Sequence, residues 1–254
     1  MRHQMTLGLG LVLLLCSLSS SAVAGTFYSS VVLSDSPLAY WNLGDAGPTA
    51  ADLTGNGHAG TGDPGVSFGQ TSLLPGDASD DSITMSGSDN VTVPGFEKFG
   101  GGATGYSVEF WMVFNAALGP FQNLVGDGEA GTDFYLMAYL LGSGQIRAHA
   151  NGSGSTAFDS ASALVQDQTY HIVTTWDQAS GVANIYIDGA LDNTAILGSG
   201  APVHTDNIVY LGDDGREPGG PISLDEVAIY DYALSSGRVA AHHSSGLVPE
   251  PSPS

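Results

Sequence analysis

Apolar and polar residues alternate along much of the chain, in short segments separated by clusters of glycine, aspartate, asparagine and serine. Successive side chains of a β-strand point to opposite faces, so a period of two predicts strands with one buried face. In residues 106–114 the alternation gives way to apolar residues on both faces, which indicates a strand packed on one side and partly covered on the other. Further strand segments are predicted at residues 169–176, 182–191, 208–211 and 224–230.

The connections between these segments predict the fold class. Asp188-Gly189 lies inside residues 182–191 and suits the two positive-φ positions of a type I′ turn, so that segment is predicted to be a hairpin. Frequent short strands without an internal repeat favour an all-β sandwich or barrel. One short C-terminal helix is expected, capped by Ser235, formed by residues 236–243 and ended just after by Gly246.

The N-terminus has the pattern of a secretory leader. An apolar run at residues 7–18 follows Arg2 and precedes Ala22-Val23-Ala24, an A-x-A cleavage site. We expect residues 1–24 to be a signal peptide, removed to leave Gly25 first; the alternative is an uncleaved anchor. Cys16 lies within this leader, so the mature chain would contain no disulfide and no cysteine-ligated metal.

The net charge of the chain limits the classes of partner that we expect it to bind. Its formal net charge is −21, with 26 acidic residues against five basic ones, and the leader contains one of those five, Arg2. Such a surface repels nucleic acid and anionic lipid, so neither is an expected partner. It suits divalent cations, although solubility alone would also explain it.

The tail, residues 247–254, contains Val-Pro-Glu-Pro at 248–251. This segment resembles the sorting signal of exopolysaccharide-associated bacterial surface proteins (PEP-CTERM). In that family an apolar helix and a basic cluster follow the motif, whereas here the sequence stops at Ser254. We therefore expect no membrane insertion once the leader is cleaved. The alternative is a frayed proline- and serine-rich end.

Several motifs, which follow one another in the same order along the chain, resemble those of the laminin-G-like jelly-roll domains of the concanavalin A-like lectin/glucanase group. The first, at 32–45, contains the Tyr-Trp-x-Leu segment, and the last, at 224–230, is Leu-Asp-Glu-Val-Ala-Ile-Tyr. The motifs between them lie at residues 52–60, 91–94, 107–111, 170–176 and 186–189. This resemblance implies a two-sheet antiparallel jelly-roll sandwich over residues 25–246.

The resemblance also implies that the loop at residues 52–57 lies close to the last strand. Calcium prefers carboxylate, amide and carbonyl oxygens. The predicted calcium ligands are Asp52, Asn56, Gly57 and Asp225, with Asp45 as a weaker candidate. The other interpretation of Gly55-Asn56-Gly57 is a tight turn without any ion, and the sequence leaves both open.

Catalytic motifs are missing from the sequence. Glucanases of this fold place their carboxylates in a Glu-x-Asp-x-x-Glu strand, and no such segment occurs. Asp225 and Glu226 are adjacent, so on a regular strand they would point to opposite faces. Glu109 stands alone among apolar residues and is expected to be either a polar strand residue or a hydrogen-bonded core group. We therefore expect no enzymatic activity.

The histidine and aromatic residues have structural interpretations. His171, His242 and His243 lack the spacing of a metal site and are expected to be structural. Trp41, Trp111 and Trp176 lie within strand motifs and are expected to be buried. The weaker, exposed candidates for sugar contact are Phe134, Tyr135 and Tyr139.

These patterns together predict a secreted or cell-surface binding module that holds a glycan or an extracellular matrix component. Two alternatives stay open: a glycan-cleaving enzyme on the same fold, and a structural matrix component without a discrete ligand. Neither the ligand nor the residues that bind it are predicted.

Overall fold

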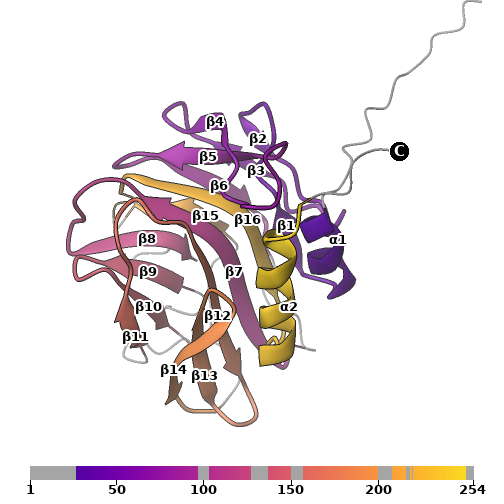
Figure 1. Cartoon of the computed structure of the whole chain (residues 1–254), viewed down its shortest axis with the longest axis vertical. Coiled ribbons are helices and arrows are strands. Elements are labelled where there is room, and N and C mark those ends of the chain that lie inside the picture. The colour runs from indigo at the N-terminus through magenta and orange to yellow at the C-terminus, as the bar shows by residue number, and fades with distance from the viewer. Residues whose placement is uncertain are drawn as a thin grey trace, which may run out of the picture.

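The computed structural model describes residues 27–96, 103–126, 137–149, 157–199, 208–215, 218 and 220–249. Within these residues the chain forms two antiparallel sheets that pack face to face, and two helices lie against the outside of one sheet (Figure 1). The predicted two-sheet antiparallel sandwich is confirmed. No helix in this part of the chain is long and apolar enough to cross a membrane. The expected leader, the end of the tail, Phe134 and Tyr135 lie outside the described residues.

The first sheet, sheet A, has the order β14 (Ala190–Ile196), β13 (Val182–Ile187), β12 (Tyr170–Asp177), β7 (Gly105–Phe114), β16 (Ile222–Tyr230), β5 (Asp81–Met85) and β4 (Ser67–Thr71), with β1 (Ala39–Trp41) paired to β16. Sheet B has the order β11 (Ala157–Ala163), β10 (Gln145–His149), β9 (Met137–Leu141), β8 (Phe121–Gly126), β15 (Ile208–Gly212), β6 (Asn90–Pro94), β3 (Gly60–Gly62) and β2 (Thr49–Ala50). The helices are α1 (Phe27–Ser34) and α2 (Ser236–Gly246).

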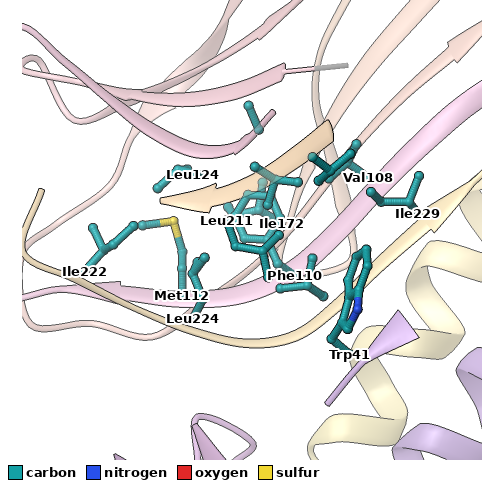
Figure 2. Close-up of a cluster of buried hydrophobic side chains, with 14 of the residues drawn as sticks. Trp41, Val108, Phe110, Met112, Leu124, Ile172, Leu211, Ile222, Leu224 and Ile229 are labelled. Atoms are coloured by element: carbon teal, nitrogen blue, oxygen red, sulfur yellow. The ribbon is translucent and has the colours of Figure 1, made fainter. Parts of the chain in front are cut away.

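The central strand β7 divides its side chains between two hydrophobic cores. Val108, Phe110 and Met112 point into the core between the sheets, as Figure 2 shows. Glu109 and Trp111, which alternate with them, lie on the opposite face beneath the helices. The strand is therefore buried on both faces, whereas the sequence pattern predicted only partial cover of the second face.

The three tryptophans are buried, which confirms the prediction for them. Trp41 and Trp176 belong to the core between the sheets, and Trp111 belongs to a second core between sheet A and the helices. The second core consists of Tyr28, Val32, Tyr40, Leu74, Trp111, Val173, Tyr186, Ala228, Tyr230, Leu234 and Val239.

The two helices pack side by side over sheet A (Figure 1). Ser235 caps α2 as predicted, because its side chain accepts a hydrogen bond from the backbone N–H of Arg238. The sequence did not predict α1. Its serine and valine pairs have weak intrinsic helix preference, so packing of the buried Tyr28 and Val32 must stabilise this helix.

The predicted hairpin turn is confirmed, with φ of +50° at Asp188 and +76° at Gly189 between β13 and β14.

We expect Gly189→Ala to lower the melting temperature, because a Cβ there would lie 2.9 Å from the Cβ of His243. The left-handed backbone alone costs an L-residue about 1–2 kcal/mol. Gly87→Ala is the matched control, since Gly87 has φ +61° and no atom near its Cβ position. If both variants melt alike in thermal scans, the contact with His243 is absent.

Candidate functional site

A β-bulge interrupts β16 at Asp225 and Glu226. The pairing of β16 with β7 shifts register between Asp225 and Ala228, and Glu226 has φ +55°. Leu224 and Val227, three residues apart, both face the core between the sheets. A regular strand would place Glu226 in that core, but the extra residue of the bulge turns its side chain away. This left-handed conformation costs a non-glycine residue of order 1–3 kcal/mol, and such strain clusters at functional sites.

The bulge brings three carboxylates together. One oxygen from each of Asp80, Asp225 and Glu226 lies within 4.8 Å of the others, and we call these three residues the acidic cluster. The prediction that Asp225 and Glu226 point to opposite faces is therefore wrong, because it assumed an uninterrupted strand. The chain offered one signal of the bulge: the apolar alternation changes parity between Leu224 and Val227.

The acidic cluster is buried, and none of the ion pairs between described residues includes it. Asp225 and Glu226 are fully buried and Asp80 is 8% exposed. Each has one carboxylate oxygen with no hydrogen-bond partner: Oδ2 of Asp80, Oδ1 of Asp225 and Oε1 of Glu226. Burial, followed by mutual repulsion, raises the pKa of Asp225 and of Glu226 well above the usual range. Burial raises the pKa of Asp80 to about 6. Unpaired buried charge of this kind is costly unless protons or a cation neutralise it.

Surrounding residues hold the other oxygens of the acidic cluster. The Tyr40 hydroxyl donates to Oε2 of Glu226, and the side-chain amide of Asn42 donates to Oδ1 of Asp80 at 3.3 Å. The backbone N–H of Leu73 donates to Oδ2 of Asp225 at 2.8 Å. Each carboxylate is thus held through one of its oxygens, and its other oxygen stays free to bind a hard cation.

Of the residues predicted to bind calcium, only Asp225 lies in the acidic cluster. Oδ1 of Asp52 accepts hydrogen bonds from the backbone N–H of Tyr40 and from the backbone N–H and the hydroxyl of Thr54. Oδ2 of Asp52 accepts one from the backbone N–H of His58 at 3.0 Å. Asn56 uses its amide to bond the backbone carbonyl of Leu38 at 3.0 Å.

The rest of the first loop forms a turn. Gly57 has φ +91° in an exposed turn. Asp45 accepts a hydrogen bond from the backbone N–H of Ala51 at 2.8 Å. The geometry of residues 52–57 is thus that of a turn stabilised by Asp52. Sequence reasoning missed Asp80 and Glu226, which the pairing of β16 with β5 and the bulge bring to Asp225.

Glu109 lies in a separate polar network under the helices, and the expectation of a hydrogen-bonded core group is confirmed. Its carboxylate accepts from the Tyr28 hydroxyl at 2.9 Å and from the Tyr230 hydroxyl at 3.0 Å. It also lies 2.8 Å from Nε2 of His171 and 2.9 Å from Nδ1 of His242. Both histidines are buried within this network, as is expected of structural residues.

Of the three aromatic residues predicted to contact sugar, only Tyr139 lies in the described part of the chain, and the structure does not support that role for it. Tyr139 is only 3% exposed and packs its ring against Phe121 and His149. The prediction of an exposed Tyr139 is wrong, because its neighbours on sheet B cover a side chain that the sequence places near a loop.

Comparison with known proteins identifies the family. A laminin G family model, described as the Concanavalin A-like lectin/glucanases superfamily, matches residues 85–240. The chain belongs to this superfamily. The resemblance inferred from the strand motifs is thereby confirmed, and the sandwich is a jelly roll of this superfamily. No curated protein sequence matches the chain.

Solved structures share the fold at low sequence identity. Trypanosoma rangeli sialidase is 13% identical with a TM-score of 0.62, over 83% of this chain and 33% of the sialidase. The botulinum neurotoxin type G receptor binding domain is 14% identical with a TM-score of 0.59, over 82% of this chain and 51% of that domain. This chain therefore spans about a third of the length of the first and half of the second. Identities this low show the shared fold alone.

Proposed function

We propose that the protein is a secreted, non-catalytic binding module that holds a glycan or another component of the extracellular matrix. The observation that carries this proposal is the burial of the acidic cluster. Most glycosidases hydrolyse their substrate with two carboxyl groups that flank the scissile bond, whereas Asp225 and Glu226 are fully buried. The lectin-like fold and the receptor-binding neighbour support binding. Export is supported by the leader pattern in residues 1–24.

We assign a structural role to the acidic cluster, as a site for one calcium ion. Oδ2 of Asp80, Oδ1 of Asp225 and Oε1 of Glu226 would contribute the side-chain ligands. The donor set fits calcium, which binds several carboxylate oxygens in flexible geometry, better than magnesium, which keeps most of its water. The ion would neutralise the repulsion and tie the segment before β5 to the bulge of β16.

A recess between three loops at one end of the sandwich is large enough for a small ligand. It has a volume of about 350 Å³, within the range of about 300–1,000 Å³ that is common for ligand sites. Its lining comes from the β7–β8, β9–β10 and β11–β12 connections and includes Leu118, Ser143 and Gln166. We propose that a sugar unit of the ligand occupies this recess.

A glycan array tests the proposed function. Protein 25–254 in calcium is expected to bind a subset of glycans reproducibly, and free glycan should compete. Ser143→Trp, which fills the recess, should abolish binding, whereas Val165→Trp, at an exposed position outside the recess lining, should not. Silence on the array would favour a matrix component without a discrete ligand. Release of reducing sugar by the pure protein would overturn the non-catalytic assignment.

A further inference from the structure

The carboxylate of Glu109 is ionised because of the groups around it. Four side chains, Tyr28, Tyr230, His171 and His242, direct polar atoms at its two oxygens over 2.8–3.0 Å. The tyrosine hydroxyls donate to it, and a protonated carboxyl could not accept from all four. Burial alone would raise the pKa of Glu109, but the His242 charge and the hydrogen bonds from both histidines outweigh burial and hold this pKa well below the usual range.

His242 lies between two carboxylates. Its Nδ1 is 2.9 Å from Oε2 of Glu109, and its Nε2 is 2.7 Å from Oδ2 of Asp35, the residue that follows α1. Nε of Arg238, whose guanidinium keeps its charge, donates to the same oxygen of Asp35 at 2.6 Å and forms an ion pair with this carboxylate. An ionised carboxylate can only accept hydrogen bonds, so both ring nitrogens of His242 must carry a proton. The ring is therefore an imidazolium in the folded protein.

The result is a row of alternating charges through the interface between helices and sheet. It runs from Glu109 on β7 through His242 on α2 to Asp35 beyond α1, and ends at Arg238 on α2. Arg238 and His242 are four residues apart and share one face of α2. The two positive charges balance the two negative ones, so the row is neutral only while His242 keeps its second proton.

We propose that His242 is a proton-dependent clamp that holds α1 and α2 on sheet A and releases them as the pH rises. Loss of one ring proton would leave a nitrogen lone pair facing a carboxylate at hydrogen-bond distance. That contact changes from attractive to repulsive, and the acceptor loses its donor in a buried place, which is costly. Release would uncover the second hydrophobic core, including Trp111 and Val239.

The groups that face His242 come from every element packed against it. They are Glu109 of β7, Asp35 after α1, Arg238 of α2, and Tyr230 of β16, whose ring centroid lies 6.4 Å away. Tyr28 of α1 and His171 of β12 act through Glu109.

These surroundings determine the direction of the pH dependence. Burial works against the charged ring, but Glu109 and then Asp35 outweigh it, so the pKa of His242 is raised. A raised histidine pKa gives stability that is complete below the unfolded value of about 6.5 and is lost as the pH rises through the folded value. Between those two values the opening equilibrium should increase about tenfold for each pH unit.

Hydrogen exchange followed by mass spectrometry tests the clamp. Protein 25–254 is held in excess calcium from pH 6 to 9.5, and rates are corrected for base-catalysed intrinsic exchange. Residues 27–34 and 236–246 are expected to lose protection about tenfold per pH unit above the ordinary histidine pKa, while residues 106–112 of β7 stay protected. The NMR shifts of the His242 ring should titrate over the same range.

Two variants and one control separate the clamp from general stability. His242→Gln should weaken protection of both helices at pH 6 and make it independent of pH. Asp35→Asn should weaken this protection and narrow the pH range over which it is lost, because Glu109 still faces the ring. His243→Gln is the matched control: His243 neighbours His242 and stacks on Trp111, and this variant should keep the pH dependence. If His242→Gln does not fold, Asp35→Asn and the ring titration of the parent decide. The proposal is overturned if the helices of the parent stay protected at pH 9.5, or if Asp35→Asn loses protection over the same pH range as the parent.

Discussion

Chelation of calcium is expected to lower the melting temperature of the protein by about 5–10 °C. An ion that binds only the folded state at 100 times its dissociation constant contributes about 2.7 kcal/mol, and each kcal/mol shifts the melting point by about 2–4 °C in a chain of this size. Without an ion, Asp80, Asp225 and Glu226 each keep one buried oxygen without a partner, in a cluster of three neighbouring carboxylates. Differential scanning calorimetry in EDTA, in calcium and in magnesium measures the effect, and only calcium should restore the parent value.

Variants of the acidic cluster show whether the ion binds there. Asp225→Asn and Glu226→Gln should each remove the difference between calcium and EDTA. Asp52→Asn is the control: it loses loop hydrogen bonds to Thr54 and His58, so it should melt lower in both buffers while the difference remains. A calcium effect that disappears in Asp52→Asn but persists in Asp225→Asn would place the ion in the first loop. An unchanged melting point in EDTA, with no metal found by elemental analysis, would remove the site altogether.

Truncation of Trp111 is expected to destabilise the protein by about 3–5 kcal/mol, the usual cost of removing a large buried aromatic side chain. Trp111 is 2% exposed and packs against Tyr28 at 6.1 Å and His171 at 5.0 Å between ring centroids. Trp111→Ala would therefore open a cavity in the second core, under both helices. Urea denaturation at constant pH measures the loss in free energy of unfolding.

Two comparisons give this experiment its control. Phe27→Ala removes an aromatic ring of the same helix layer that is 43% exposed, so it should cost far less. Trp111→Phe keeps part of the packing and should fall between Trp111→Ala and the parent. If Trp111→Ala has the same denaturation midpoint as the parent, the register of β7 with β12 and β16 is wrong.

Local pattern was sufficient for the strands that it predicted, because alternation reports directly which face of a strand is buried. It did not predict others, among them β8, β9, β10 and β11. The central strand, the hairpin at Asp188-Gly189 and the cap at Ser235 were all predicted from short segments and confirmed. Each depends on residues close in sequence. The family resemblance likewise depended on ordered local motifs.

The candidate site was predictable only in part, because its residues are distant in sequence. Asp80 meets Asp225 only through the pairing of β5 with β16, and Glu226 joins them only through a bulge that tertiary packing imposes. Glu109 and His242 are 133 positions apart. The α1 helix depends on burial against Trp111 more than on its own weak propensity.

The sequence by itself therefore determined the all-β class, the buried faces of the predicted strands, and one residue of the acidic cluster, Asp225. Tertiary structure alone decided which carboxylates Asp225 meets and which charge His242 carries. The physical reason is that a strand's faces follow from local side-chain geometry. The protonation and ion affinity of a buried group follow instead from its distance to other charges and from its removal from water, and those are properties of the folded chain.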